Sequence, residues 1–329
     1  MASIQARDGK FRAQIRYKNV SRSATFSSYR EAERWAALME KMIDDGEYCA
    51  IPRISFKTLF DRYLREVSPH KASCKKENQF FARLEKYSLA NKKLDELNEA
   101  DFQQWRDRRL KEVKVGTLLR EWSILSNLLK VAVNEWRVLP RNYLKGIKKP
   151  SEPLSRTQRW SQDNIDLIVQ LSGFNWDEPL DTLTKRVALA FLFAIATAMR
   201  AGEICGLTWE NIYFSSRVAH LPKTKNGYPR DVPLSRDALR ILEKLEKEKI
   251  GKEVFGMNVN QLAALFRKLK NKALLNDLHF HDTRREALTR LSRKVDVMTL
   301  AKISGHRDLS ILQNTYYAPR MSEVADLLD

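Results

Sequence analysis

The spacing of apolar residues changes from two to about four within the first fifty positions. Residues 10–18 alternate between apolar and mainly basic positions, the pattern of a strand with one buried face. The apolar positions are Phe11, Ala13, Ile15 and Tyr17. Turn residues separate this segment from neighbouring short strands, and a helical stripe follows over residues 29–43. We predict a three-stranded sheet backed by one helix over residues 1–48.

Residues 52–147 show apolar residues at every third or fourth position, which predicts a compact helical domain. The expected helices cover residues 56–64, 80–87, 100–113 and 117–136. The period then disappears in a stretch with two prolines and one glycine, and we place an interdomain linker at residues 148–160.

The remaining residues, 161–329, predict an α+β domain. A helix is expected to begin at Ser161, and residues 181–198 are apolar on all sides, as in the central helix of a core. Two strand-like segments, residues 217–221 and 228–234, flank Asn226-Gly227, a strong hairpin signal. The predicted fold is therefore multidomain and mainly α, with small β-sheets.

The net charge and the composition indicate which class of partner the protein binds. The chain has 329 residues, a formal net charge of +18 and a pI near 9.8, which favour nucleic acid. The longest apolar run, residues 187–199, is shorter than the roughly 20 residues that cross a bilayer. No signal peptide is recognisable, so we expect a cytoplasmic protein without membrane contact. No spacing of cysteines, histidines or carboxylates predicts a metal, and no glycine loop predicts a nucleotide cofactor.

Several residues suggest phosphate chemistry. Arg200 ends the apolar helix with Glu203 three residues later, and Lys225 lies at the hairpin tip. His281 and Arg284 share one face of a predicted helix, and a guanidinium beside an imidazole suits a phosphate. Taken singly, these residues would be explained by a structural Arg–Glu pair, a soluble turn and a charged surface helix, and only their combination favours a site.

Taken in order, these elements resemble the tyrosine recombinase, or phage integrase, family over essentially the whole chain. The matching motifs are Thr197-Ala198-Met199-Arg200, Lys225 before Val232-Pro233, His281-Asp282-Thr283-Arg284, Gly305-His306, and Tyr316 or Tyr317.

The sequence departs from the family pattern at three places. Ala198 stands where glycine is common, and Arg285 stands where a histidine is frequent. The tyrosines lie at least one residue farther from His306 than is usual in the family. Tyr316 needs the smaller insertion, so we prefer it to Tyr317 as the nucleophile.

The resemblance implies a role for each motif residue. Arg200, Arg284 and His306 would hold the phosphate, and the tyrosine would attack it to give a 3′-phosphotyrosyl link. Lys225 would be the general acid, His281 would assist proton transfer at the tyrosine, and Glu203 would support the arginines. Neither a metal nor a cofactor is implied.

The resemblance also implies that residues 1–48 bind arm-type DNA sites and that residues 52–147 bind core sites. The candidate DNA contacts are Lys10, Arg12, Arg16, Lys75, Lys76 and Arg106. The partners implied are double-stranded DNA and three further copies in a homotetramer, and accessory DNA-bending proteins are compatible with this.

The expected function is site-specific recombination that integrates or excises a phage or mobile element. Two alternatives are DNA relaxation of the type IB topoisomerase kind and a non-catalytic DNA-binding regulator on the same scaffold. The extra amino-terminal domain disfavours the first alternative, and the filled catalytic positions disfavour the second.

Overall fold

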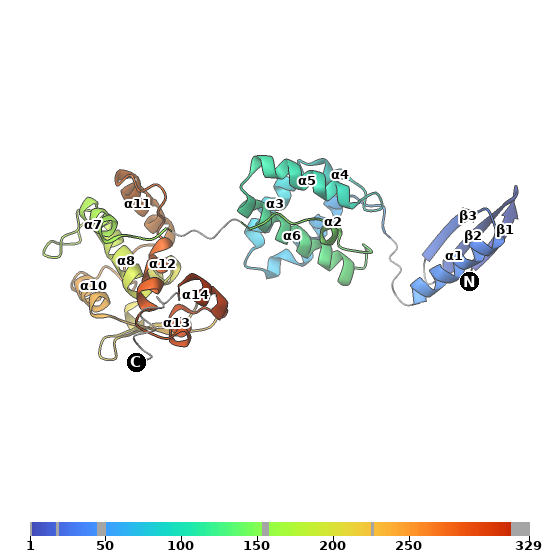
Figure 1. Ribbon diagram of the computed structural model, residues 1–329. Helices are drawn as coiled ribbons and strands as arrows, with labels where there is room; N and C mark the ends of the chain where they lie inside the picture. The colour runs from blue at the N-terminus through green and yellow to red at the C-terminus, as the bar shows by residue number, and fades with distance from the viewer. Residues whose placement is uncertain (1, 18–19, 45–50, 153–157, 225–226, 317–329) are drawn as a thin grey trace, which may run out of the picture. The chain divides into compact units, whose positions relative to one another are not determined.

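The computed structural model describes residues 2–17, 20–44, 51–152, 158–224 and 227–316 (Figure 1). The chain divides between Ser155 and Arg156 into two compact units, and the first of these contains a sheet region followed by a helical region. None of the described helices is long and apolar enough to span a bilayer.

The amino-terminal region is the predicted three-stranded antiparallel sheet with one helix. Its strands are β1 (Ala2–Arg7), β2 (Lys10–Tyr17) and β3 (Val20–Phe26), in that order across the sheet, and α1 (Tyr29–Asp44) packs on one face. The alternation predicted for β2 is confirmed, since Ala13 and Ile15 are fully buried while Arg12 and Arg16 are exposed.

The helical region contains α2 (Phe56–Glu66), α3 (Cys74–Leu84), α4 (Ser88–Asn91), α5 (Glu99–Glu112) and α6 (Val115–Asn134). Short 3₁₀ helices, η1 (Ser68–His70) and η2 (Tyr143–Gly146), flank them. Aromatic rings fill the core, with Phe60 stacked on Phe81 at a centroid distance of 5.0 Å. The predicted helix at residues 80–87 is displaced, because α3 begins at Cys74 and ends at Leu84.

The polar start of α3 explains that displacement. Glu77 is 4% exposed and accepts hydrogen bonds from the hydroxyls of Ser68 (2.7 Å) and Ser73 (2.9 Å). These hydrogen bonds stabilise the first turn of the helix without an apolar stripe, so the hydrophobic period does not reveal it.

The carboxyl-terminal unit is built around α8 (Leu183–Thr197), the predicted central helix. It contacts α7 (Gln162–Leu171), α10 (Arg236–Lys247), α11 (Val259–Lys272) and α12 (Asp282–Leu291). The apolar residues of α8 are almost all buried, which explains its lack of a polar face.

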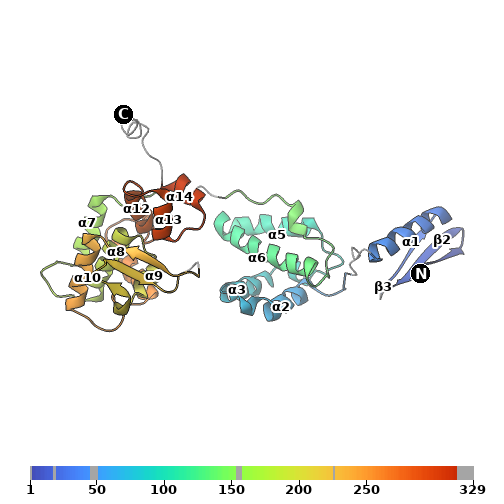
Figure 2. The ribbon, with the colours of Figure 1, turned by 90° about the horizontal axis from the view of Figure 1, so that it is seen from below.

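A small sheet, one 3₁₀ helix and three short α-helices complete the described part of this unit. The strands β4 (Ile212–Tyr213), β5 (Val218–Leu221) and β6 (Arg230–Pro233) form an antiparallel sheet in that order. The 3₁₀ helix η3 (Trp209–Asn211) precedes it, α9 (Ala201–Cys205) follows α8, and α13 (Val297–Ser304) and α14 (Leu309–Thr315) follow α12. Figure 2 shows α12, α13 and α14 gathered at one end of the unit. The two-residue strand β4 is too short for the sequence pattern to predict.

The end of α11 generates a stability prediction. Leu274 has φ 58° and is 82% exposed, so its side chain is strained in the left-handed region and buries little surface. Leu274→Gly should stabilise the unit by about 0.5–1 kcal/mol. Leu274→Ala retains a Cβ and should change the free energy of unfolding little. Native-state hydrogen exchange of α8 amides measures both, and equal effects of the two substitutions would contradict the backbone explanation.

Candidate active site

Glu203 links two arginines. Its side chain is buried and accepts two hydrogen bonds from Arg200, one from the backbone N–H (2.8 Å) and one from Nη1 (2.9 Å). It also accepts both Nη1 and Nη2 of Arg230, at 2.8 and 2.7 Å. Burial by itself would raise the pKa of Glu203, but the bonds from Arg230 and Arg200 outweigh it and lower the pKa to about 2. The carboxylate is therefore ionised at neutral pH.

Arg284 lies between the ends of two helices. Its Nη1 donates to the carbonyl of Ala198 and its Nη2 to the carbonyl of Ser304, both at 2.5 Å. Ala198 caps the end of α8, and Ser304 is the last residue of α13. Burial and the neighbouring charges of Arg200 and Arg230 lower the pKa of Arg284 to about 10, so the guanidinium keeps its charge at neutral pH.

His306 follows the left-handed Gly305 (φ 70°) that ends α13. Its Nδ1 lies 2.7 Å from the Ser304 hydroxyl. Burial, followed by the charges of Arg284, Arg200 and Arg230, lowers the pKa of His306 to about 4. The imidazole is therefore neutral in the DNA-free chain at pH 7.

Tyr316 ends α14 beside these groups. Its ring centroid lies 6.5 Å from that of His306, and the guanidinium of Arg285 lies 5.5 Å from the tyrosine ring. The Ser292 hydroxyl donates to its backbone carbonyl at 2.9 Å. Arg285, where the family often has histidine, thus contacts the preferred nucleophile.

Of the three other candidate residues, the structure describes one. His281 is exposed immediately before α12, three residues from Arg284. Lys225 and Tyr317 lie outside the described residues. Among the residues that are described, no group of three or more histidine, cysteine, aspartate or glutamate side chains is placed to hold a metal ion.

Arg230 was missed by the sequence analysis. It begins β6, its side chain is 8% exposed, and its Nε donates to the carbonyl of Ile303 at 2.9 Å. It therefore joins the hairpin strand to Glu203 on one side and to the end of α13 on the other. A Cβ at Gly305 would lie 3.3 Å from Arg230, so glycine suits this position for packing as well as for its positive φ.

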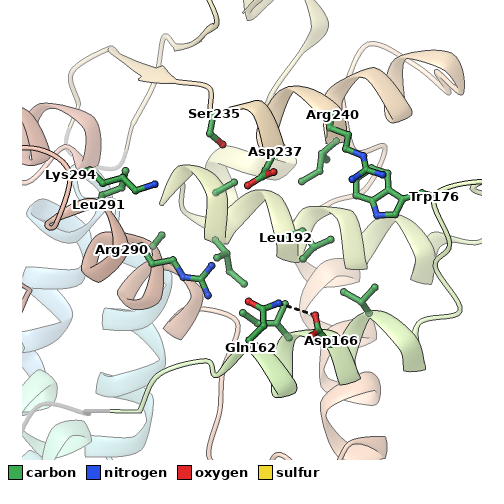
Figure 3. Close-up of a pocket in the computed structure, with 16 residues that line it drawn as sticks. Gln162, Asp166, Trp176, Leu192, Ser235, Asp237, Arg240, Arg290, Leu291 and Lys294 are labelled. Carbon is green, nitrogen blue, oxygen red and sulfur yellow. Dashed lines mark hydrogen bonds between the residues drawn. The ribbon is translucent and has the colours of Figure 1, made fainter.

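A cleft of about 460 Å³ in the same unit lies outside this cluster (Figure 3). Leu192 and Ile195 contribute to its apolar lining, and Asp166, Arg240 and Arg290 are among its charged residues. Because it contains none of the candidate catalytic side chains, it is separate from the candidate active site.

The open face of the amino-terminal sheet is polar and cationic. Lys10, Arg12 and Arg16 are exposed on β2, and the register places Gln5 of β1 and Thr25 of β3 opposite Arg12. The strand residues on this face, as the register assigns it, include no carboxylate. They are Ser3, Gln5, Arg7, Lys10, Arg12, Gln14, Arg16, Ser21, Ser23 and Thr25.

The core-site candidates differ in accessibility. Lys75 and Lys76 are exposed on α3. Arg106 on α5 is mostly buried, and it donates to the carbonyl of Lys148 (2.9 Å) and to Asp107 (2.7 Å). A DNA contact by Arg106 stays a prediction, and it would compete with these bonds.

Residues 158–323 match the model of the phage integrase family. A Haemophilus influenzae integrase/recombinase is 47% identical, with 98% of this chain and 89% of the relative covered. An Escherichia coli shufflon-specific DNA recombinase is 33% identical, with 80% and 69% covered. The chain belongs to the phage integrase family of tyrosine recombinases. Its function at the level of this family is DNA recombination.

Solved structures agree on the fold. A lambda integrase dimer bound to a core site aligns with a TM-score of 0.66 at 15% identity, covering 96% of this chain and 94% of that one. The Tn1549 transposon integrase in complex with circular intermediate DNA aligns with a TM-score of 0.66 at 17% identity, covering 84% and 99%.

The buried pair of Arg230 and Glu203 generates a second prediction. Arg230→Met leaves a buried carboxylate with one partner fewer and should destabilise the unit by about 3–5 kcal/mol. Adding Glu203→Gln removes the buried charge, so the double variant should be destabilised by less than the sum of the single effects. Hydrogen exchange of α8 measures all three variants. Strict additivity would show that the two side chains are not energetically coupled.

The lowered pKa of His306 generates a third prediction. An unfolded histidine has a pKa near roughly 6.5, so between this value and about 4 the unfolded chain takes up a proton that the folded chain does not. The stabilising contribution of His306 is therefore complete above pH 6.5 and is lost as the pH falls toward 4. Relative to His306→Gln, the DNA-free wild type should lose stability across this window, and a constant difference in α8 hydrogen exchange would contradict the shift.

Proposed function

We propose that this protein is a site-specific integrase that cuts and rejoins double-stranded DNA through a covalent 3′-phosphotyrosyl intermediate. The observation that carries the proposal is the meeting of Arg200, Arg284, His306 and Tyr316. They are spread over positions 200 to 316 of the chain, and Glu203 holds Arg200 through a hydrogen bond from its Nη1.

The charges of this cluster suit a phosphodiester. The guanidiniums of Arg200 and Arg230 bond to the carboxylate of Glu203, and the guanidinium of Arg284 interacts with the same carboxylate through its charge. Three positive charges facing this one carboxylate leave excess positive charge for an anion. Arg230 and Arg284 are buried and committed to protein oxygens, whereas Arg200 is 20% exposed. Such fixed cations stabilise the negative charge that develops on phosphorus when a nucleophile attacks.

The chemical steps follow from the residues. The phenol oxygen of Tyr316 forms a bond to phosphorus, and the bond between phosphorus and the 5′-oxygen breaks. The departing 5′-oxygen must receive a proton to become a hydroxyl. We assign that proton to Lys225, with His281 assisting proton transfer at the tyrosine, because the family resemblance gives them these roles. Rejoining reverses the steps and conserves the phosphodiester energy in the covalent link.

The partners and biological role follow from the relatives. One fold neighbour is a lambda integrase tetramer bound to a Holliday junction, and others are bound to core-site or transposon DNA. By analogy, this chain would act as a homotetramer that inserts or excises a mobile element, with accessory DNA-bending proteins where arm sites are used. DNA relaxation without recombination remains the alternative activity that paired-site plasmids would reveal.

The nucleophile provides the decisive test. A library of nicked duplexes with random sequence should yield protein–DNA complexes that resist detergent, and sequencing the trapped DNA would identify the core site. Tyr316→Phe should abolish these complexes, whereas the matched variant Tyr317→Phe should retain them because its phenol is not the nucleophile. Peptide mass spectrometry locates the linked residue. Trapping by Tyr316→Phe but not by Tyr317→Phe would reassign the nucleophile, and no trapping by the wild type would overturn the proposal.

We further propose that the open face of the amino-terminal sheet binds a second class of DNA site. Its cationic residues and the lack of carboxylates among its assigned strand residues support this. Replacing Lys10, Arg12 and Arg16 together by glutamine should leave covalent complex formation at the core site within about twofold and reduce integration at least about tenfold, as expected for lost phosphate contacts. The control replaces exposed Arg30 and Arg34 of α1, away from the face. Equal loss with the control variant would contradict a specific interface.

A further inference from the structure

Ser304 contacts two of the phosphate-binding candidates at once. It is fully buried at the end of α13. Its backbone carbonyl accepts Nη2 of Arg284 at 2.5 Å, and its hydroxyl lies 2.7 Å from Nδ1 of His306. The sequence analysis gave this serine no role.

The surrounding bonds determine where the hydroxyl proton points. Among the residues that the structure describes, the hydroxyl also lies 3.4 Å from the carbonyl oxygen of Ala301. That carbonyl already accepts the backbone N–H of Gly305 at 2.7 Å and that of His306 at 3.2 Å. Because a carbonyl has two lone pairs and 3.4 Å is long for an O–H···O bond, the Ser304 hydroxyl donates to Nδ1 of His306 instead.

The direction of this bond selects a tautomer. A neutral imidazole carries one N–H, so a ring whose Nδ1 accepts a hydrogen bond carries its proton on Nε2. The neutral form is favoured by burial and by the cations that face the ring, Arg284 from α12, Arg200 before α9 and Arg230 from β6. The opposite tautomer would present an unprotonated Nε2, whose lone pair repels a phosphate oxygen.

We propose that Ser304 is a positioning residue that holds His306 as the Nε2–H tautomer, so that a neutral imidazole donates a hydrogen bond to a non-bridging phosphate oxygen. The proposal rests on the proposed function, because it assigns His306 a phosphate. Through its carbonyl, the same serine also holds Arg284, so one buried residue orients His306 and the guanidinium beside it.

The tautomer can be observed without DNA or activity. The full-length chain labelled with ¹⁵N-histidine contains five histidines, and the signal missing from His306→Ala assigns His306. At pH 7 the spectrum should show a protonated Nε2 and an unprotonated, hydrogen-bonded Nδ1. Ser304→Ala should remove the hydrogen-bond shift of Nδ1, whereas Ser310→Ala, which breaks a hydroxyl bond to Asp308 on α14, should not. A proton on Nδ1 in the wild type would overturn the proposal.

A double-mutant cycle separates this role from a structural one. Ser304→Ala should slow covalent complex formation on the trapped core site roughly five- to tenfold, the effect of one hydrogen bond. In the His306→Ala background, it should slow the reaction no further. An equal loss in both backgrounds would show that Ser304 acts through Arg284 or the fold, and would overturn the proposal. If the wild type forms no covalent complex, the proposed function fails while the ¹⁵N spectrum still decides the tautomer.

Discussion

The arrangement of the site depends on the hydrogen bonds between the carboxylate of Glu203 and two arginines. The carboxylate receives two bonds from Arg200 and two from Arg230, and both oxygens are used. Without this anion, three guanidiniums would lie in one partly buried region with no countercharge among the bonds described here. Their mutual repulsion and desolvation oppose folding, so the position of Glu203 decides whether the arginines can be held together at all.

Helix ends provide the second constraint. Arg284 donates to carbonyls at the ends of α8 and α13, where backbone acceptors lack helical partners and carry partial negative charge. Both ends use a left-handed residue, Ala198 (φ 56°) and Gly305 (φ 70°). For alanine this conformation costs about 1–2 kcal/mol. The buried methyl group of Ala198 packs beside Leu288 and Leu300 and recovers about 0.8 kcal/mol. By these two terms the family's common glycine would be favoured over this alanine by about 0.2–1.2 kcal/mol.

The sequence was informative where local pattern determines structure. The alternation of β2, the all-apolar α8 and the helical stripes of the second region are periodic, so these elements were predicted correctly. The order of motifs gave the family and the residues Arg200, Arg284 and His306 of the cluster. By contrast, the start of α3 is stabilised by serine hydroxyls around Glu77, which leave no period, and β4 is too short to show one.

Arg230 and Ser304 were missed for a different physical reason. Arg230 looks like an ordinary basic residue after a turn, and Ser304 looks like a polar residue at a helix end. Arg230 bonds to Glu203, which is 27 residues away in the sequence. Ser304 accepts a bond from Arg284, 20 residues away, in addition to its contact with the neighbouring His306. Only the folded chain brings these partners together.

The bonds of Arg230 and Arg284 explain how a site with excess positive charge can be rigid before DNA binds. Every bond that Arg230 and Arg284 make in the cluster described here is to a protein oxygen, so neither guanidinium has to reorganise when a phosphate arrives. In the function proposed above, Arg200, the more exposed arginine, and the imidazole of His306 contact the substrate. A site whose dipoles and charges are oriented in advance avoids most of the reorganisation that water would require. Such preorganisation is usually the largest single contribution that an enzyme makes to stabilising charge in a transition state.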